Sequence, residues 1–160
     1  MSTRSNILVT DGDENLLFYR HSDGYPTGQR TLIEFMKLIK EGEIRNNVNQ
    51  SAGWLIVFGH KEYCKENINQ YTVHDWKVGA YEPTDMYGGD IEFFYVCDIK
   101  NMNIKVYSAN MWEIRLDNDG LKSQKNIDKA IHQKALKLLG TITDFKTSEL
   151  ERIEKIGDDE

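Results

Sequence analysis

The chain has 160 residues and a formal net charge of −6, with 39% hydrophobic and 29% charged residues. This composition fits one globular domain and excludes an intrinsically disordered chain. The acidic balance also excludes broad, sequence-independent binding of nucleic acids, which depends on lysine and arginine contacts to phosphates.

The distribution of apolar residues and cysteines indicates which class of protein this is. The longest apolar run, residues 54–58, is too short to span a membrane, and no signal peptide is recognisable at the N-terminus. Two cysteines do not make a disulfide framework. We therefore expect no membrane partner and a cytoplasmic location.

The first third of the chain predicts a β-hairpin followed by a helix. Strands are expected at residues 6–10 and 16–21, with an Asp-Gly turn between them. Residues 31–41 predict an amphipathic helix, because apolar side chains recur at i, i+3, i+4 and i+7 from Leu32. Thr31 with Glu34 has capping-box spacing, and the glycine at position 42 suits a C-terminal cap.

The middle of the chain is ambiguous at first and then rich in strands. Residues 49–65 fit either a buried strand or a helix, and we favour a helix capped by Asn49 or Ser51. Aromatic and β-branched residues predict strands at 91–99 and 104–109, which a short loop joins as a hairpin.

The last part of the chain predicts one further strand and a second helix. The strand is expected at residues 112–116, and the helix at 126–140, with Asn126 as its cap and Gly140 at its end. The order of elements indicates an α+β fold. We expect a single domain over residues 1–145, with a mostly antiparallel sheet and two to four helices packed on one face, and a charged C-terminal helix end and tail over residues 146–160.

The candidate ligand-binding residues gather around the loop between the second strand and the first helix. Asp23 is close enough in sequence to orient the His21 imidazole, and arginine with a tyrosine hydroxyl at a helix N-terminus fits an anion or a phosphate. The predicted ligand-binding set is Arg4, Arg20, His21, Asp23, Tyr25 and Arg30. The alternative is an ordinary turn, in which Asp23-Gly24 reverses the chain and Pro26 fixes φ.

Two other groups of residues have weaker patterns. Residues 80–92 combine four carboxylates with Gly88-Gly89, which fits a cation or close ligand approach but equally a solvated acidic loop. His60, Cys64 and His74 lack a fourth ligand at a typical spacing. We therefore predict no metal and no cofactor.

An enzymatic interpretation rests on Ser2. Removal of the initiator methionine would expose Ser2 ahead of a β-hairpin, the layout of N-terminal nucleophile hydrolases, in which the terminal amine serves as the base. A second catalytic alternative uses His21 with Asp23. The Ser2 mechanism lacks a defined oxyanion partner, and we predict no catalytic residues.

Several segments resemble a family of small uncharacterised proteins encoded by bacteriophages and bacteria. They are "MSTRSNI" at the start, "YRHSDGYP", "SAGWL" (where the family has "SGWL"), "YEPT" and "GDIEFFYV". The similarity covers about the first 110 residues and leaves the C-terminal helix outside it. It implies a phage-type accessory protein in the host cytoplasm, with host-defence antagonism by analogy, and it transfers no catalytic residue.

Together these observations predict a non-catalytic binding protein. Its expected partner is a small anionic ligand such as a nucleotide, or a host protein, bound through the surface of the predicted ligand-binding residues. A third alternative is an inhibitor that binds a protein partner through the acidic loop at Glu82 and Asp85. We expect a small homo-oligomer.

Overall fold

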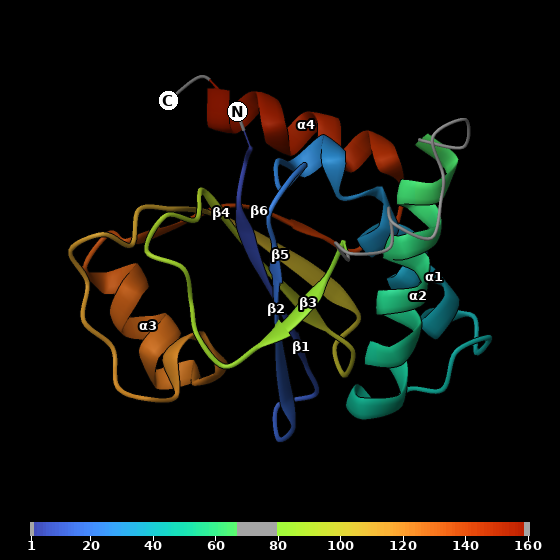
Figure 1. The fold of residues 1–160 in the computed structure, drawn as a ribbon, viewed down its shortest axis with the longest axis horizontal. Coiled ribbons are helices and arrows are strands. Elements are labelled where there is room, and N and C mark those ends of the chain that lie inside the picture. Colours follow the sequence, from blue (N-terminus) through green and yellow to red (C-terminus); the bar gives the residue numbers. More distant parts are fainter. Residues whose placement is uncertain (1, 67–79, 159–160) are drawn as a thin grey trace.

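The computed structural model describes residues 2–66 and 80–158, which form one six-stranded sheet flanked by helices (Figure 1). The strands are β1 (Ser5–Thr10), β2 (Asn15–Arg20), β3 (Glu82–Thr84), β4 (Phe93–Asp98), β5 (Asn103–Ala109) and β6 (Leu136–Ile142). Their order across the sheet is β3-β2-β1-β4-β5-β6. Each neighbouring pair is antiparallel except β1 with β4, which run parallel at the centre. The predicted α+β class with a mostly antiparallel sheet is confirmed.

β1 and β2 form the predicted hairpin, paired along their whole length. Its turn is built locally: Gly12 has a φ of 97°, which glycine adopts without steric cost. The carboxylate of Asp11 accepts hydrogen bonds from the backbone N–H groups of Asp13 (2.9 Å) and Glu14 (2.7 Å). Because side chains alternate along a strand, this hairpin sets which residues of β2 lie on each face of the sheet.

Helices cover both faces of the sheet. They are α1 (Arg30–Lys40), α2 (Val48–Glu66), α3 (Gln124–His132) and α4 (Thr147–Asp158). Ile7 and Val9 of β1 point into the core shared with α1, α2 and α4, whereas Leu8 between them points into the core shared with α3. Figure 1 shows α3 apart from the other three helices. The prediction of two to four helices on one face holds for α1, α2 and α4, and α3 adds a layer on the opposite face.

α1 begins one residue earlier than predicted, at Arg30, and its first turn is not a capping box. Thr31 lies inside the helix, is buried, and donates its hydroxyl hydrogen bond to Glu62 of α2. The predicted Thr31–Glu34 cap is therefore wrong, because a tertiary contact takes the hydroxyl. Gly42 follows the helix with a φ of 80°, as expected for a C-terminal glycine.

The helix favoured for residues 49–65 is present as α2, but its predicted caps are wrong. α2 begins at Val48, and the side chain of Asn47 accepts a hydrogen bond from the backbone N–H of Gln50 at 3.0 Å. Asn49 and Ser51 therefore lie within the first turn of the helix. The structure places the cap two residues before the nearer predicted residue.

The predicted helix at residues 126–140 is only partly right. α3 ends at His132, and after a short turn the chain enters β6, which pairs antiparallel with β5. Lys134 has a φ of 62°, and the N–H of Ala135 donates to the carbonyl of Ala130 at 2.8 Å. Pairing with β5 outweighs the helical periodicity of this segment, an example of tertiary structure overriding local preference.

The predicted strand at residues 112–116 and the predicted helix cap at Asn126 are also wrong. Residues 112–116 form no regular strand. The cap of α3 is Ser123, whose hydroxyl accepts a hydrogen bond from the Asn126 N–H at 3.4 Å. Asn126 is instead buried, and its amide donates to Asp117 (2.6 Å) and to the carbonyl of Gly120 (2.9 Å). These bonds fasten the loop before α3.

The segment expected to be a charged helix end and tail contains α4. Leu150 and Ile153 of α4 are buried and belong to the core formed with α1 and α2. Among the described residues, no helix combines the length and the apolar character needed to cross a membrane.

Candidate functional site

Strand alternation divides the predicted ligand-binding residues between the two faces of the sheet. Arg20 points toward α2, whereas Tyr19 packs against the core on the α3 face. The hydroxyl of Tyr19 lies 2.9 Å from Nδ1 of His21, and Arg4 is near enough to influence the pKa of Tyr19. The structure thus brings Arg4 and His21 together beside Tyr19 and places Arg20 on the other face.

Arg20 is completely buried in a polar cluster with Gln29, Glu62 and Tyr81, which we call the Arg20 network. Its Nη1 donates to the Tyr81 hydroxyl (2.6 Å) and to Oε1 of Gln29 (3.3 Å). The same Nη1 is 3.6 Å from a carboxylate oxygen of Glu62, and Nε donates to the carbonyl of Ser22 at 2.8 Å. The Tyr81 hydroxyl in turn donates to Oε1 of Gln29 at 2.7 Å, so Arg20, Tyr81 and Gln29 form a ring of hydrogen bonds.

The surroundings of Arg20 keep its guanidinium positively charged. Burial alone would lower the pKa of Arg20, but Tyr81, Glu62 and Tyr63 outweigh it and raise that pKa. Burial raises the pKa of Tyr81, with Arg20 opposing it, so Tyr81 stays neutral. The Nη2 atom of Arg20 is buried without a hydrogen-bond partner among residues 2–66 and 80–158. In this conformation the guanidinium has no surface at which a ligand could meet it.

Arg4 and His21 belong to a separate cluster at the surface. The Nε of Arg4 is 3.1 Å from a carboxylate oxygen of Asp90, and both side chains are partly exposed. Burial raises the pKa of Tyr19, the charge of Asp90 adds to this rise, and Arg4 opposes it. The charge of Arg4 is therefore largely balanced by Asp90 at short range.

The remaining predicted residues form a turn. Asp23 accepts a hydrogen bond from the Tyr25 hydroxyl at 3.3 Å, and within the described chain no hydrogen bond joins it to His21. Asp23 has a φ of 60°, and the N–H of Gly24 donates to the carbonyl of Thr3 at 2.9 Å. A Cβ at Gly24 would lie 2.7 Å from that oxygen, so the close approach requires glycine. The expected orientation of His21 by Asp23 does not occur.

Arg30 lies apart from both clusters in its contacts. It is the exposed first residue of α1, and among the described residues no hydrogen bond or ion pair links it to the other five predicted residues. The six residues therefore do not converge on one surface. Only Arg4 and His21 share a face and a common neighbour.

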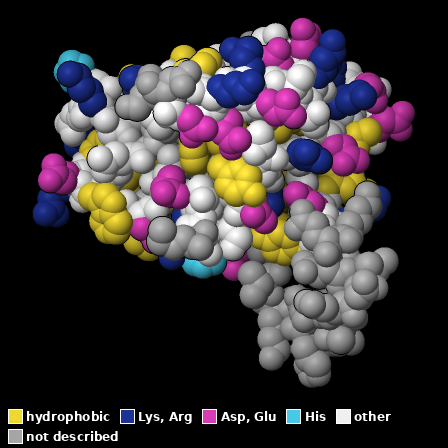
Figure 2. All heavy atoms as spheres, turned by 90° about the horizontal axis from the view of Figure 1, so that it is seen from above, with side chains coloured by type: hydrophobic (Ala, Val, Ile, Leu, Met, Phe, Trp, Pro, Cys, Tyr) yellow, Lys and Arg dark blue, Asp and Glu magenta, His cyan; other side chains and the backbone are white. Residues whose placement is uncertain are grey.

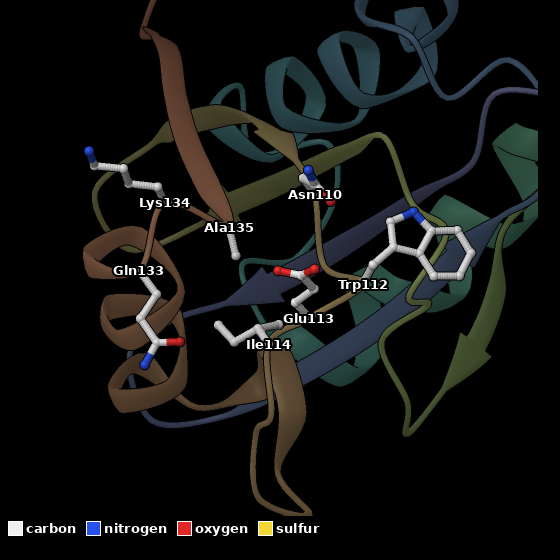
Figure 3. A pocket seen from close by; sticks show the side chains of 7 residues that line it. All are labelled: Asn110, Trp112, Glu113, Ile114, Gln133, Lys134 and Ala135. Carbon is white, nitrogen blue, oxygen red and sulfur yellow. The ribbon is translucent and has the colours of Figure 1, made fainter.

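A different surface combines concavity with exposed apolar side chains. Three hollows of about 480, 500 and 510 Å³ adjoin at Trp112, which lines all of them, and we call them together the Trp112 groove. The first hollow lies between the Trp112 segment and the turn from α3 to β6 (Figure 3). The residues that line the groove are 2–4, 85–87, 89–92, 109–114, 116–118, 120 and 133–135.

The exposed side chains of the groove are held on fixed backbone. Trp112 is 73% exposed and Met86 is 76% exposed. A Cβ built on Gly89 would lie 3.7 Å from Cε3 of Trp112, so one part of the indole packs on the bare Gly89 backbone. The Tyr87 hydroxyl donates to the carbonyl of Ile114 at 3.3 Å and joins the two loops. Large exposed apolar side chains on an ordered support are typical of binding surfaces.

The groove is more acidic than basic. Its charged side chains are Arg4, Asp85, Asp90, Glu92, Glu113, Asp117 and Lys134. Figure 2 shows acidic and basic side chains intermixed over the face that it presents. In the described part of the chain, no group of three or more His, Cys, Asp or Glu side chains is placed to hold a metal ion.

The sequence interpretation missed Trp112 as a site residue because it assigned Trp112 to a strand. The signal that could have indicated the region was Gly88-Gly89, which the sequence interpretation linked to close approach and which the structure places beside the indole. His74, which the sequence grouped with His60 and Cys64, and Trp76, which the sequence offers for stacking on a base, lie outside the described residues. Comparison of the chain with protein-family models, with curated proteins and with solved structures finds no match in any of the three.

Proposed function

We propose that this protein is a non-catalytic binding protein and that the Trp112 groove is its ligand surface. The observation that carries the proposal is the 73% exposure of Trp112 at the meeting point of three hollows. Each hollow falls in the size range of ligand sites, roughly 300–1,000 Å³. An exposed indole on a rigid support provides a large contact area at little cost in side-chain entropy.

The contacts of the groove's charged groups support binding rather than acid–base chemistry. Asp90 is paired with Arg4, and Asp85 is paired with Lys122 at 3.0 Å. Asp117 accepts the hydrogen bond from Asn126 that fastens the loop. These carboxylates hold the walls of the groove together.

The small anionic ligand expected from the sequence remains a proposal, but fewer of the predicted residues support it. Of the three arginines in the predicted set, only Arg4 lines the groove. A phosphate there would have to compete with Asp90 for the guanidinium, with Glu92 close by. A protein partner fits this charge balance better. The family resemblance adds the proposal that the protein acts as a phage-type accessory in a host cytoplasm, as a host-defence antagonist.

The site is tested by fragment screening with ¹H–¹⁵N NMR, which does not require the natural ligand. The sequence has three tryptophans, whose indole N–H signals can be assigned with single Trp→Phe variants. We expect fragments to shift the Trp112 signal in preference to that of Trp54, which is 51% exposed on α2 and serves as the control. Fragments that collect at Trp54, or that leave both signals unchanged, would contradict the proposal.

A hydrolase using Ser2 is the second candidate, and one observation favours it. Ser2 lines the third hollow of the groove together with Arg4 and Asp90, so a Ser2 nucleophile would open onto a concave surface. The Ser2 hydroxyl lies 3.5 Å from that of Ser22. Intact-mass spectrometry tests the candidate directly: the mechanism requires a free Ser2 amine, and a protein that retains Met1 excludes it.

A further inference from the structure

We propose that the Trp112 groove binds an extended, lysine- or arginine-containing segment of a partner protein, with a cationic side chain held against the indole of Trp112. This inference rests on the proposed function of the groove and names the chemistry of its partner. It follows from three properties of the surface: its charge balance, the exposed ring at its centre, and the combined size of its three hollows.

The charge balance of the groove leaves negative charge available to a partner. Five of its seven charged side chains are carboxylates. Among the described residues, Glu92 and Glu113 are exposed and form no ion pair. In Figure 3 the carboxylate of Glu113 lies in the first hollow, while the amino group of Lys134 points away from it. Arg4 is already paired with Asp90.

The aromatic ring adds a recognition element for cations. The face of an indole attracts an ammonium or guanidinium group, by about 0.5–1 kcal/mol at an exposed site. The ring of Trp112 packs on Gly89 over only a small part of its surface and keeps the rest exposed. A cation over the ring would lie on a surface that also presents Glu92 and Glu113, in separate hollows.

The combined size of the three hollows favours a peptide segment over a small cation. One ammonium group would occupy a single hollow, whereas three adjoining hollows of about 480–510 Å³ leave room for several side chains. An extended segment advances about 3.3 Å per residue and sends alternate side chains to one side. Such a segment could place a cation at the indole and an apolar side chain at the exposed Met86. Nucleic acid does not fit this rim, because its phosphates would face carboxylates.

The test is a titration of the full chain with two short synthetic peptides of equal length, one alternating arginine with alanine and the other glutamate with alanine. The indole N–H signals of Trp112 and Trp54 are followed by NMR. We expect the arginine peptide to shift the Trp112 signal in a saturable way and the glutamate peptide to leave it unchanged. Raised salt should weaken the binding.

Matched variants separate the groove from general attraction to an acidic protein. Glu92→Gln/Glu113→Gln removes two groove charges, and Glu41→Gln/Glu43→Gln removes two exposed charges near the end of α1. The first pair should lower the affinity for the arginine peptide about three- to tenfold, and the second pair should lower it by less than about twofold. Trp112→Ala should lower the affinity for the arginine peptide at least about threefold, while Trp54→Ala should not. Because each variant removes an indole signal, these affinities are read from the backbone amide signals of the groove.

Each contrary result overturns the partner assignment. If both glutamine pairs lower the affinity for the arginine peptide equally, the attraction is non-specific. If the glutamate peptide or ATP binds saturably at Trp112, the groove prefers an anionic partner and the proposed basic partner is wrong. If neither peptide binds but neutral fragments still shift Trp112, the basic partner is excluded and the ligand site stands. If fragments also miss Trp112, both proposals fail.

Discussion

The Arg20 network and the Trp112 groove arrange polar and apolar groups in opposite ways. Arg20 is a charged side chain with no exposed surface, whereas Trp112 is a large aromatic side chain left 73% exposed. A buried charge costs free energy unless hydrogen bonds and an opposite charge compensate it, and Tyr81, Gln29 and Glu62 provide them. The indole has few comparable contacts within the protein.

This difference distinguishes a structural role from a binding role. The contacts of Arg20 are already made in the free protein, so they stabilise the fold. The contacts that Trp112 could make are mostly unmade, so they are available to a partner. Arginine as a residue type suggested a ligand contact at position 20, but its burial identifies it as part of the core.

The largest effect is expected from Arg20→Ala. Removing the guanidinium leaves Glu62 and the Tyr81 hydroxyl without their partner and opens a cavity under α2, so we expect a loss of about 3–5 kcal/mol in the free energy of unfolding. Urea denaturation followed by circular dichroism measures it. The control is Arg30→Ala at an exposed position, expected within about 0.5 kcal/mol of wild type. Comparable stability of the two variants would contradict a structural role for Arg20.

A smaller loss is expected from Tyr81→Phe, which keeps the ring and removes one hydroxyl. That hydroxyl accepts from Arg20 and donates to Gln29, so its removal leaves these two buried groups with only the longer 3.3 Å hydrogen bond between them. We expect a loss of about 1–3 kcal/mol in the same denaturation experiment. Tyr25→Phe, at a half-exposed position, should change stability far less. An unchanged midpoint for Tyr81→Phe would show that the network contributes little.

Acid should loosen the wall of the groove at Asp117. Hydrogen bonds from the Asn126 side chain and the Asp119 N–H lower the pKa of Asp117 below 3.8. Because the folded pKa lies below the unfolded one, this stabilisation is present above pH 3.8 and is lost as the pH falls through the folded value. The protection of the amides of residues 117–126, measured by hydrogen exchange relative to the intrinsic exchange rate at each pH, should therefore fall in that acid range.

The control for this acid effect is a pair of charge-removing variants. Asp117→Asn should abolish the acid-dependent loss of protection, whereas Asp119→Asn, which removes the same charge two residues away, should retain it. If protection of the loop does not depend on acid in the wild type, the Asp117–Asn126 bond does not hold the loop.

The smallest effect on stability is expected at the groove itself. Trp112→Ala removes an exposed ring, so the free energy of unfolding should stay within about 0.5 kcal/mol of wild type. Phe94→Ala, in the buried core on the same face of the sheet, should cost about 3–5 kcal/mol. A large loss for Trp112→Ala would mean that the indole is part of the fold and would remove the contrast with Arg20.

Local features of the fold could be predicted from the sequence, and non-local ones could not. The β1–β2 hairpin follows from alternation and a glycine in its turn, and α1 follows from the helical spacing of its apolar residues. The change from α3 to β6 after His132 was missed because it depends on β5, which lies more than twenty residues earlier in the chain. The cap of α1 was missed for a similar reason, since Thr31 bonds to Glu62 in another helix.

The sequence by itself determined that Arg20 and His21 point to opposite faces, because successive side chains of a strand alternate whatever surrounds them. Only the tertiary structure decided what covers each face. Tyr81, 61 residues from Arg20 in sequence, and Glu62 of α2 enclose the guanidinium, while the loops that meet at Trp112 leave its ring in solvent. Backbone direction is set by neighbouring residues, whereas burial is set by contacts between residues far apart in the chain, and no local pattern records which of those contacts form.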